Sequence, residues 1–233
     1  MKRIGLIGGM SWESSIEYER IINEEVRRRL GGTHSADLII RSFDFAVIEA
    51  LQSTGDWTTA GELLARAARD LEQCGADVLV LCTNTMHRLA DEISDAVSIP
   101  LLHIADATAL HIQQAGLRTV GLIGTKYTME ASFYAGRLRS RYGFDIRIPH
   151  ERDRNEIHRI IYDELVQGII NDASRERYVE IVNDLVASGA EGVIAGCTEI
   201  ELLLTEDDIS VPYFPTTRLH ATAAVDVALA SEL

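Results

Sequence analysis

An internal repeat constrains the fold of this chain more than any other feature. Three short segments of the first half return in the second half, in the same order and at nearly constant separation. The paired segments are residues 3–8 with 119–124, residues 75–83 with 189–197, and residues 98–100 with 210–212. Each match alone is weak, because apolar runs that end at glycine are common. Together, three collinear matches indicate two copies of one structural unit.

The periodicity of the apolar residues gives both copies an α/β character. Short apolar runs that end at glycine are typical of buried parallel strands, and apolar residues at helical spacing lie between them. The expected strands are residues 3–7, 38–45, 78–82, 119–123 and 193–195, and the expected helical stripes lie at residues 18–30, 63–74 and 178–185. This alternation predicts two similar α/β domains with parallel sheets. Such sheets bind ligands beyond the carboxyl ends of their strands, so we expect the active site in a cleft between pseudo-twofold related domains.

Composition narrows the classes of partner. The chain has 233 residues, of which 46% are hydrophobic and 25% charged, an ordinary globular composition. Its 36 acidic against 22 basic residues give a net charge of −14, which repels phosphate backbones and anionic membranes. We therefore expect neither a nucleic-acid nor a membrane partner, and no run approaches the ~20 apolar residues of a membrane span. Three cysteines fit a reducing compartment, so a cytoplasmic location is expected.

The repeat also pairs the residues that can carry chemistry. Aligned without gaps from Gly75 and Gly189, Thr83 lies opposite Cys197, and both follow a predicted strand. Opposed proton-transfer groups are what racemisation requires: one group removes an α-proton, and the other returns a proton to the opposite face. A cysteine thiol suits this step, because its ordinary pKa is about 8.5 and backbone N–H donors can lower it.

Competing interpretations exist for each polar position. Cys197 could be a small buried hydrophobe, but its flexible and polar neighbours favour a functional role. Strand alternation turns Cys82 away from Thr83, which favours packing, and Cys74 continues a helical apolar stripe into the core. His87, four residues after Thr83, fits a packed or capping residue better than a catalytic one.

Three segments resemble the aspartate/glutamate racemase family, whose members are cofactor-independent amino-acid racemases with two α/β domains. They are residues 8–14 (GGMSWES), 83–87 (TNTMH) and 196–199 (GCTE), and the likeness extends over essentially the whole chain. Most family members have cysteine at both catalytic positions. Thr83 replaces the first cysteine here, as in a subgroup associated with L-aspartate, L-glutamate and broader amino-acid racemisation.

The resemblance implies roles for further residues. Thr83 and Cys197 are the expected catalytic pair, and five residues are expected to bind substrate. These are Met10, Gln52, Asn84, Thr85 and Thr198. Capping of the following helix is a nearly equal alternative for Asn84 and Thr85. The implied domains are residues 1–98 plus 213–233 and residues 99–212, and the implied assembly is a homodimer without metal or other cofactor.

Two other functions remain open from the sequence. A single thiol opposite a non-thiol residue also suits a one-cysteine decarboxylase or isomerase of dicarboxylates. A non-catalytic protein that binds amino acids for regulation would keep the two lobes and close on its ligand by a hinge. The retained Cys197 argues against that second alternative.

The lysine count generates a first prediction. Pyridoxal phosphate requires a Schiff-base lysine, and the sequence has only Lys2 and Lys126. The activity that the resemblance implies should therefore survive dialysis against a chelator and need no added pyridoxal phosphate or nucleotide. Loss of optical activity of an amino acid, followed by circular dichroism, measures this. Activity that disappears on chelation and returns with a metal would contradict the two-base interpretation.

Overall fold

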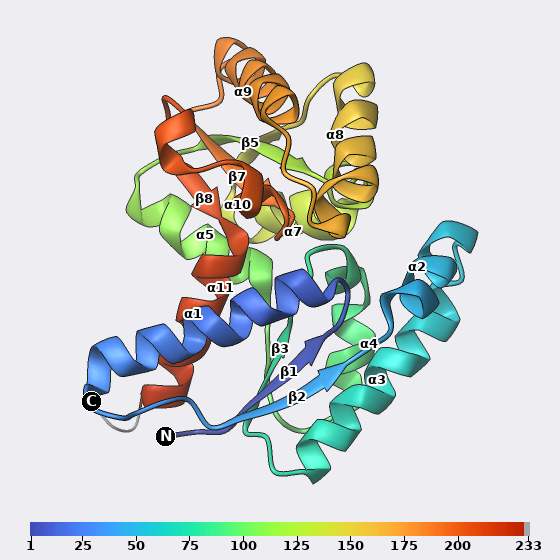
Figure 1. The fold of residues 1–233 in the computed structure, drawn as a ribbon, viewed down its shortest axis with the longest axis vertical. Helices are drawn as coiled ribbons and strands as arrows, with labels where there is room; N and C mark the ends of the chain where they lie inside the picture. The colour runs from blue at the N-terminus through green and yellow to red at the C-terminus, as the bar shows by residue number, and fades with distance from the viewer. Residues whose placement is uncertain (231–233) are drawn as a thin grey trace. The chain divides into compact units, whose positions relative to one another are not determined.

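The computed structural model describes residues 1–230 and divides them into two compact units (Figure 1). Unit 1 comprises Met1–His103 and the described part of the segment that begins at His220, and unit 2 comprises Ile104–Leu219. Of the first domain expected from the sequence, residues 231–233 lie outside the described residues. The units divide later in the chain than at 98/99 and 212/213, because β4 and β8 each pair with a strand of the preceding unit.

Unit 1 alternates strands and helices from its first residues. Its elements are β1 (Ile4–Gly8), α1 (Trp12–Leu30), β2 (Leu38–Ser42), α2 (Phe45–Thr54), α3 (Trp57–Gln73), β3 (Val78–Leu81), the 3₁₀ helix η1 (Thr85–Leu89), α4 (Ala90–Asp95) and β4 (Leu101–Leu102). Helix α11 (Thr216–Leu229, red in Figure 1) begins in unit 2 and continues into unit 1.

Unit 2 repeats this alternation with more helix. Its elements are α5 (Ile104–Gln114), β5 (Thr119–Gly124), α6 (Lys126–Glu130), α7 (Ser132–Tyr142), β6 (Asp145–Arg147), α8 (Glu151–Asp163), η2 (Leu165–Gln167), α9 (Asp172–Ala187), β7 (Gly192–Gly196), α10 (Ile200–Leu203), η3 (Glu206–Asp208) and β8 (Tyr213–Pro215).

The two sheets have the same topology. Among the described residues each sheet has four parallel strands, in the orders β2-β1-β3-β4 and β6-β5-β7-β8. This confirms the predicted α/β class with two similar parallel sheets.

Strand register reproduces the gap-free alignment of the repeat. Ile4 pairs with Val78 in unit 1, and Val120 pairs with Gly192 in unit 2. These four residues are equivalent pairs in the sequence repeat, so the register and the alignment agree independently. The carboxyl ends of β3 and β7 are therefore equivalent places in the two units.

A main-chain bond at the last repeat segment shows the same equivalence. The Leu79 N–H donates to the Pro100 carbonyl at 2.9 Å, and the Val193 N–H donates to the Pro212 carbonyl at 2.9 Å. The repeated Ser-X-Pro segments thus place the fourth strand of each sheet by the same contact.

Helices cover both faces of the unit 1 sheet, as strand alternation requires. On one face, Ile4 and Val80 pack with α1 and α11 in a buried cluster that also contains Cys82. On the other face, Ile7 and Leu81 pack with α2, α3 and η1. Burial on both faces explains why these strands read as continuous apolar runs.

Unit 2 has one core that also reaches the end of β7. Buried side chains from α5, α7, α8 and α9 pack on β5 and β7, and Cys197 belongs to this cluster. The thiol therefore lies at the boundary between an apolar core and the polar residues that follow the strand.

Two local expectations are wrong. The strand expected over residues 38–45 ends at Ser42, because Asp44 caps α2 by accepting a hydrogen bond from the Ala46 N–H at 3.1 Å. Cys74 is exposed rather than packed in the core. Cys74 is the C-cap residue of α3, which ends at Gln73, so its side chain lies beyond Leu71, the last buried residue of the helical stripe.

No helix in the described part of the chain is both long enough and apolar enough to cross a membrane.

A close approach between β5 and β7 generates a stability prediction. A Cβ added at Gly124 would lie 2.7 Å from the Gly196 carbonyl oxygen, immediately before Cys197. We expect Gly124→Ala to lower the free energy of unfolding by about 1–3 kcal/mol, the usual cost of overpacking.

Gly136→Ala is the matched control for this prediction. Gly136 lies within α7, and an added Cβ would make only an ordinary 3.5 Å contact with Ser132. Helix propensity should then raise stability by up to about 1 kcal/mol. Denaturant titration of both variants measures the two effects. Equal stability of Gly124→Ala and the parent protein would contradict the close approach.

Candidate active site

Buried polar residues follow both equivalent strands. Thr83, Asn84 and Thr85 come after β3, and Cys197 and Thr198 come after β7; each is at most 7% exposed. Buried polar side chains require hydrogen-bond partners or a ligand, so their concentration at two strand ends marks candidate binding chemistry.

In unit 1, both backbone polar groups of Thr83 are hydrogen-bonded. Its N–H donates to the Leu81 carbonyl at 2.8 Å, and its carbonyl accepts a hydrogen bond from His87 Nδ1 at 2.7 Å. This geometry fixes the tautomer of the imidazole, because a carbonyl can only accept and Nδ1 must therefore carry hydrogen. His87 thus has a definite contact with a candidate catalytic residue, which the sequence pattern did not reveal.

The remaining unit 1 residues expected in the site lie around the same segment. Gln52 is buried on α2, and its Nε2 donates to the Met86 sulfur at 2.9 Å. Met10 belongs to the same buried cluster as Met86. Asn84 occupies the N-cap position of η1, but its side chain makes no capping hydrogen bond. The structure therefore gives no support to the capping alternative for Asn84.

In unit 2, a carboxylate binds both polar side chains that follow β7. The Cys197 thiol donates to Glu199 Oε2 at 2.9 Å, and the Thr198 hydroxyl donates to the same oxygen at 2.8 Å. Glu199 was not among the site residues expected from the sequence. The signal that could have found it is a carboxylate two residues after a cysteine at a strand end.

Burial and negative charge determine the protonation state of Cys197. Burial raises the pKa of its thiol well above the ordinary value, and the charge of Glu199 and the hydrogen bond donated to it raise that pKa further. The resting group is therefore a neutral thiol that already points its proton at a carboxylate. Such a pair can form a thiolate when Glu199 accepts the proton.

A second carboxyl group lies in the same part of unit 2. Burial raises the pKa of Glu201 to about 7, although a hydrogen bond from the Thr217 N–H at 2.7 Å opposes the shift. The charge of Glu201 also contributes to the raised pKa of Cys197. Sequence reasoning did not find this residue, because its burial depends on the packing of α10 and α11.

Cys82 has none of these features. Its side chain is fully buried in the core cluster under α1 and α11, and burial alone raises the pKa of its thiol. Within residues 1–230, its sulfur donates only to the Val80 carbonyl, at 3.8 Å. Of the two buried cysteines, Cys197 is thus the one with a proton acceptor.

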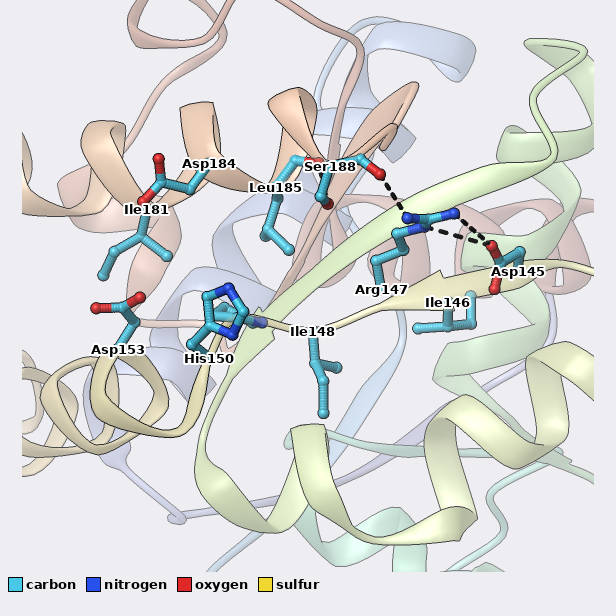
Figure 2. A pocket seen from close by; sticks show the side chains of 11 residues that line it. Asp145, Ile146, Arg147, Ile148, His150, Asp153, Ile181, Asp184, Leu185 and Ser188 are labelled. Atoms are coloured by element: carbon cyan, nitrogen blue, oxygen red, sulfur yellow. Dashed lines mark hydrogen bonds and ion pairs between the residues drawn. The ribbon is translucent and has the colours of Figure 1, made fainter.

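A surface cavity of about 390 Å³ in unit 2 has a different character (Figure 2). Ile181 and Leu185 of α9 form part of its lining. Arg147 bonds to Asp145 and to the Ser188 carbonyl, and Asp153 pairs with Arg177 at 2.5 Å. Most charged groups here balance one another, and no thiol lines the cavity, so we place the reactive chemistry at the strand ends.

Among residues 1–230, no group of three or more histidine, cysteine, aspartate or glutamate side chains is arranged to hold a metal ion.

Comparisons with known proteins identify the family of the chain. The sequence pattern of the Asp/Glu/hydantoin racemase family matches residues 7–224. The fold is similar to the crystal structure of a candidate Asp/Glu racemase from Yersinia pestis, with 54% identity, a TM-score of 0.92, and coverage of 98% of this chain and 100% of that chain. It is also similar to an aspartate racemase homologue from Pyrococcus horikoshii, with 34% identity, a TM-score of 0.85, and coverage of 98% and 99%.

A further relative has lower identity. The broad-specificity amino-acid racemase RacX of Bacillus subtilis is 23% identical over 167 residues, which cover 69% of this chain and 68% of RacX. The family match spans both strand ends and both units. The chain therefore belongs to the Asp/Glu/hydantoin racemase family, and it is an isomerase.

Proposed function

We propose that this protein is a cofactor-independent racemase of amino acids, with aspartate and glutamate as its preferred substrates. The observation that carries the proposal is the buried Cys197 thiol, hydrogen-bonded to Glu199 at a strand end whose equivalent in the other unit carries Thr83. The names of the Yersinia and Pyrococcus relatives support the choice of acidic amino acids. The name of RacX supports testing other amino acids as substrates as well.

The proposed reaction starts from the neutral thiol. Glu199 accepts the proton of Cys197, and the resulting thiolate removes the α-proton from one face of the amino acid. Thr83 serves the opposite face, where its hydroxyl relays a proton from a water molecule to the α-carbon. The hydroxide that remains accepts the proton that Glu199 took up, which restores the carboxylate, the thiol and the water. In the reverse reaction the same proton transfers run in the opposite order. General acid–base catalysis of this kind contributes ~10²–10⁴-fold to a rate.

Substrate binding is assigned to the neighbouring polar residues. Asn84, Thr85 and Thr198 hold the α-carboxylate through side-chain and backbone donors, while Met10 and Gln52 line the pocket. Donors of this kind also stabilise the negative charge that develops when the α-proton leaves. The working assembly is proposed to be a homodimer, as the family resemblance implies.

Thr83 also keeps a second candidate function open. A hydroxyl is a far weaker acid and base than a thiol, so one-sided protonation by Cys197 would suit a dicarboxylate decarboxylase or isomerase. The two reactions differ in what they do to an amino acid. Only the racemase exchanges the α-proton of both enantiomers and removes optical activity.

An exchange screen tests the proposed function. Each enantiomer of the common amino acids is incubated with the protein in deuterated water, and α-proton loss is followed by NMR alongside circular dichroism. Arylmalonate and maleate are included for the alternative reaction. We expect exchange and racemisation of aspartate or glutamate. Turnover of maleate or arylmalonate without exchange of any amino acid would favour the alternative, and tight amino-acid binding without exchange would indicate a binding protein.

A set of substitutions tests the catalytic pair. Cys197→Ser should lower kcat by ~10²–10⁴-fold, because a hydroxyl replaces the thiol acid–base group. Thr83→Ala should suppress racemisation but spare exchange of the enantiomer whose α-proton faces Cys197. Thr83→Cys should make the activities toward the two enantiomers more nearly equal.

Controls for this set come from residues outside the proposed machinery. Cys82→Ala and the cavity variant Asp184→Asn should retain parental rates, with folding verified by circular dichroism. An inactive Cys82→Ala beside a fully active Thr83→Ala would show that the repeat alignment selects the wrong residue.

Replacement of Glu199 should make the Cys197 thiol easier to alkylate and yet lower turnover. Glu199→Gln removes the negative charge that helps to raise the Cys197 pKa, so that pKa should fall and alkylation of the thiol should begin at lower pH. Turnover should nevertheless fall, because the proton acceptor is lost.

The rate of alkylation by iodoacetamide, followed against pH, measures the change in the Cys197 pKa. The measurement uses a Cys74→Ser, Cys82→Ala background, where Cys197 is the only cysteine of the sequence. The same background with Glu199 intact is the reference. An alkylation profile that moves to higher pH, or turnover that is unchanged, would contradict the proposed role of Glu199.

A further inference from the structure

Unit 1 contains three buried histidines whose rings lie in contact. The histidine cluster consists of His87, His103 and His220, which are 2%, 7% and 0% exposed. The ring centroids of His87 and His103 are 4.7 Å apart, and those of His87 and His220 are 5.6 Å apart. Buried imidazoles are costly unless their nitrogens are hydrogen-bonded, so this arrangement requires a reason.

His220 is locked as a neutral imidazole. Its Nε2 donates to the Leu102 carbonyl at 2.9 Å, and its Nδ1 accepts a hydrogen bond from the Tyr18 hydroxyl at 2.9 Å. Burial, followed by the neighbouring His87, lowers the pKa of His220 to about 3, despite the opposing bond to Leu102. With both nitrogens hydrogen-bonded, the His220 ring is held between α1 and β4.

His87 packs against the His220 ring and is hydrogen-bonded to Thr83. Its Nδ1–H donates to the Thr83 carbonyl at 2.7 Å, while the Thr83 N–H is bonded to Leu81. Both main-chain polar groups of Thr83 are therefore held. The side chain of Thr83 leaves the chain from this held backbone, so the position of its hydroxyl depends on the imidazole.

We propose that His87 is a positioning residue that holds the Thr83 hydroxyl at the place from which it serves the α-carbon, and that His220 and Tyr18 hold His87. The inference rests on the proposed function, in which Thr83 serves one face of the substrate. A misplacement of about 1 Å at a reacting group can lower a rate by ~10²-fold, which is the scale expected here.

The chain provides its own guide to a conservative substitution. Asn23 in α1 donates from Nδ2 to the carbonyl of Glu19, four residues earlier, at 2.9 Å. His87→Asn can therefore keep a donor for the carbonyl of Thr83, which is also four residues earlier. His87→Leu has a similar volume but no donor, and it leaves a buried carbonyl without its partner.

His111 supplies the matched control. On α5 of unit 2, its Nδ1 bonds to the Ala107 carbonyl at 3.0 Å, again four residues earlier. His111→Leu removes the same kind of contact away from the strand ends. Any general effect of losing a histidine-to-carbonyl bond should appear in this variant as well.

Kinetics distinguish positioning from a general packing role. His87→Leu should lower kcat by ~10²-fold and leave KM within about threefold of the parental value. The kcat of His87→Asn should be at least about tenfold higher than that of His87→Leu. The loss should fall mainly on the enantiomer whose α-proton faces Thr83. Exchange of the enantiomer whose proton faces Cys197 should persist in deuterated water. Tyr18→Phe should produce a smaller loss with the same asymmetry, and His111→Leu none.

Crystal structures provide a readout that does not depend on activity. Thr83 should shift in His87→Leu and return in His87→Asn. An unmoved Thr83, or equal loss of exchange for both enantiomers in a folded His87→Leu protein, would overturn the positioning role. Absence of amino-acid exchange in the parent protein would instead overturn the racemase proposal, and the position of Thr83 in the variants would still decide the structural inference.

Discussion

Main-chain pairing of the central strands is the constraint on which the site depends. β1 holds β3 and β5 holds β7 in equivalent registers, so both strands deliver their next residues at the carboxyl edge of a parallel sheet. At the end of β5, Gly124 lets the backbone of Gly196 approach more closely than any side chain would allow. The position of Cys197 thus follows from backbone packing as much as from its own side chain.

The two strand ends use the same scaffold for different chemistry. In unit 2 a buried thiol donates to a carboxylate, which keeps it protonated until that proton is accepted. In unit 1 the equivalent residue is a threonine, whose backbone carbonyl accepts a hydrogen bond from an imidazole. In the proposed mechanism, one half therefore depends on the electrostatics of the thiol, and the other half depends on the placement of the hydroxyl.

This asymmetry explains why a duplicated fold does not imply duplicated roles. Repetition fixes where two side chains emerge, because strand register is a property of the backbone. It does not fix their acidity, which depends on burial, charge and hydrogen bonds from residues that the repeat does not preserve. Glu199 and His87 are two residues that the repeat does not preserve: the first accepts a hydrogen bond from a thiol, and the second donates one to a backbone carbonyl.

The sequence by itself determined the two-unit organisation, the parallel strands and the equivalence of Thr83 with Cys197, because apolar periodicity and repeat spacing are local properties. It misplaced the end of β2 and the side chain of Cys74, where a cap or a helix end interrupts the period. Only the tertiary structure decided the contact between Tyr18 and His220 and the edge-on ring contact between His220 and His87. These residues are distant in the chain, and the distances between them are set by how helices pack on the sheet, which no local pattern encodes.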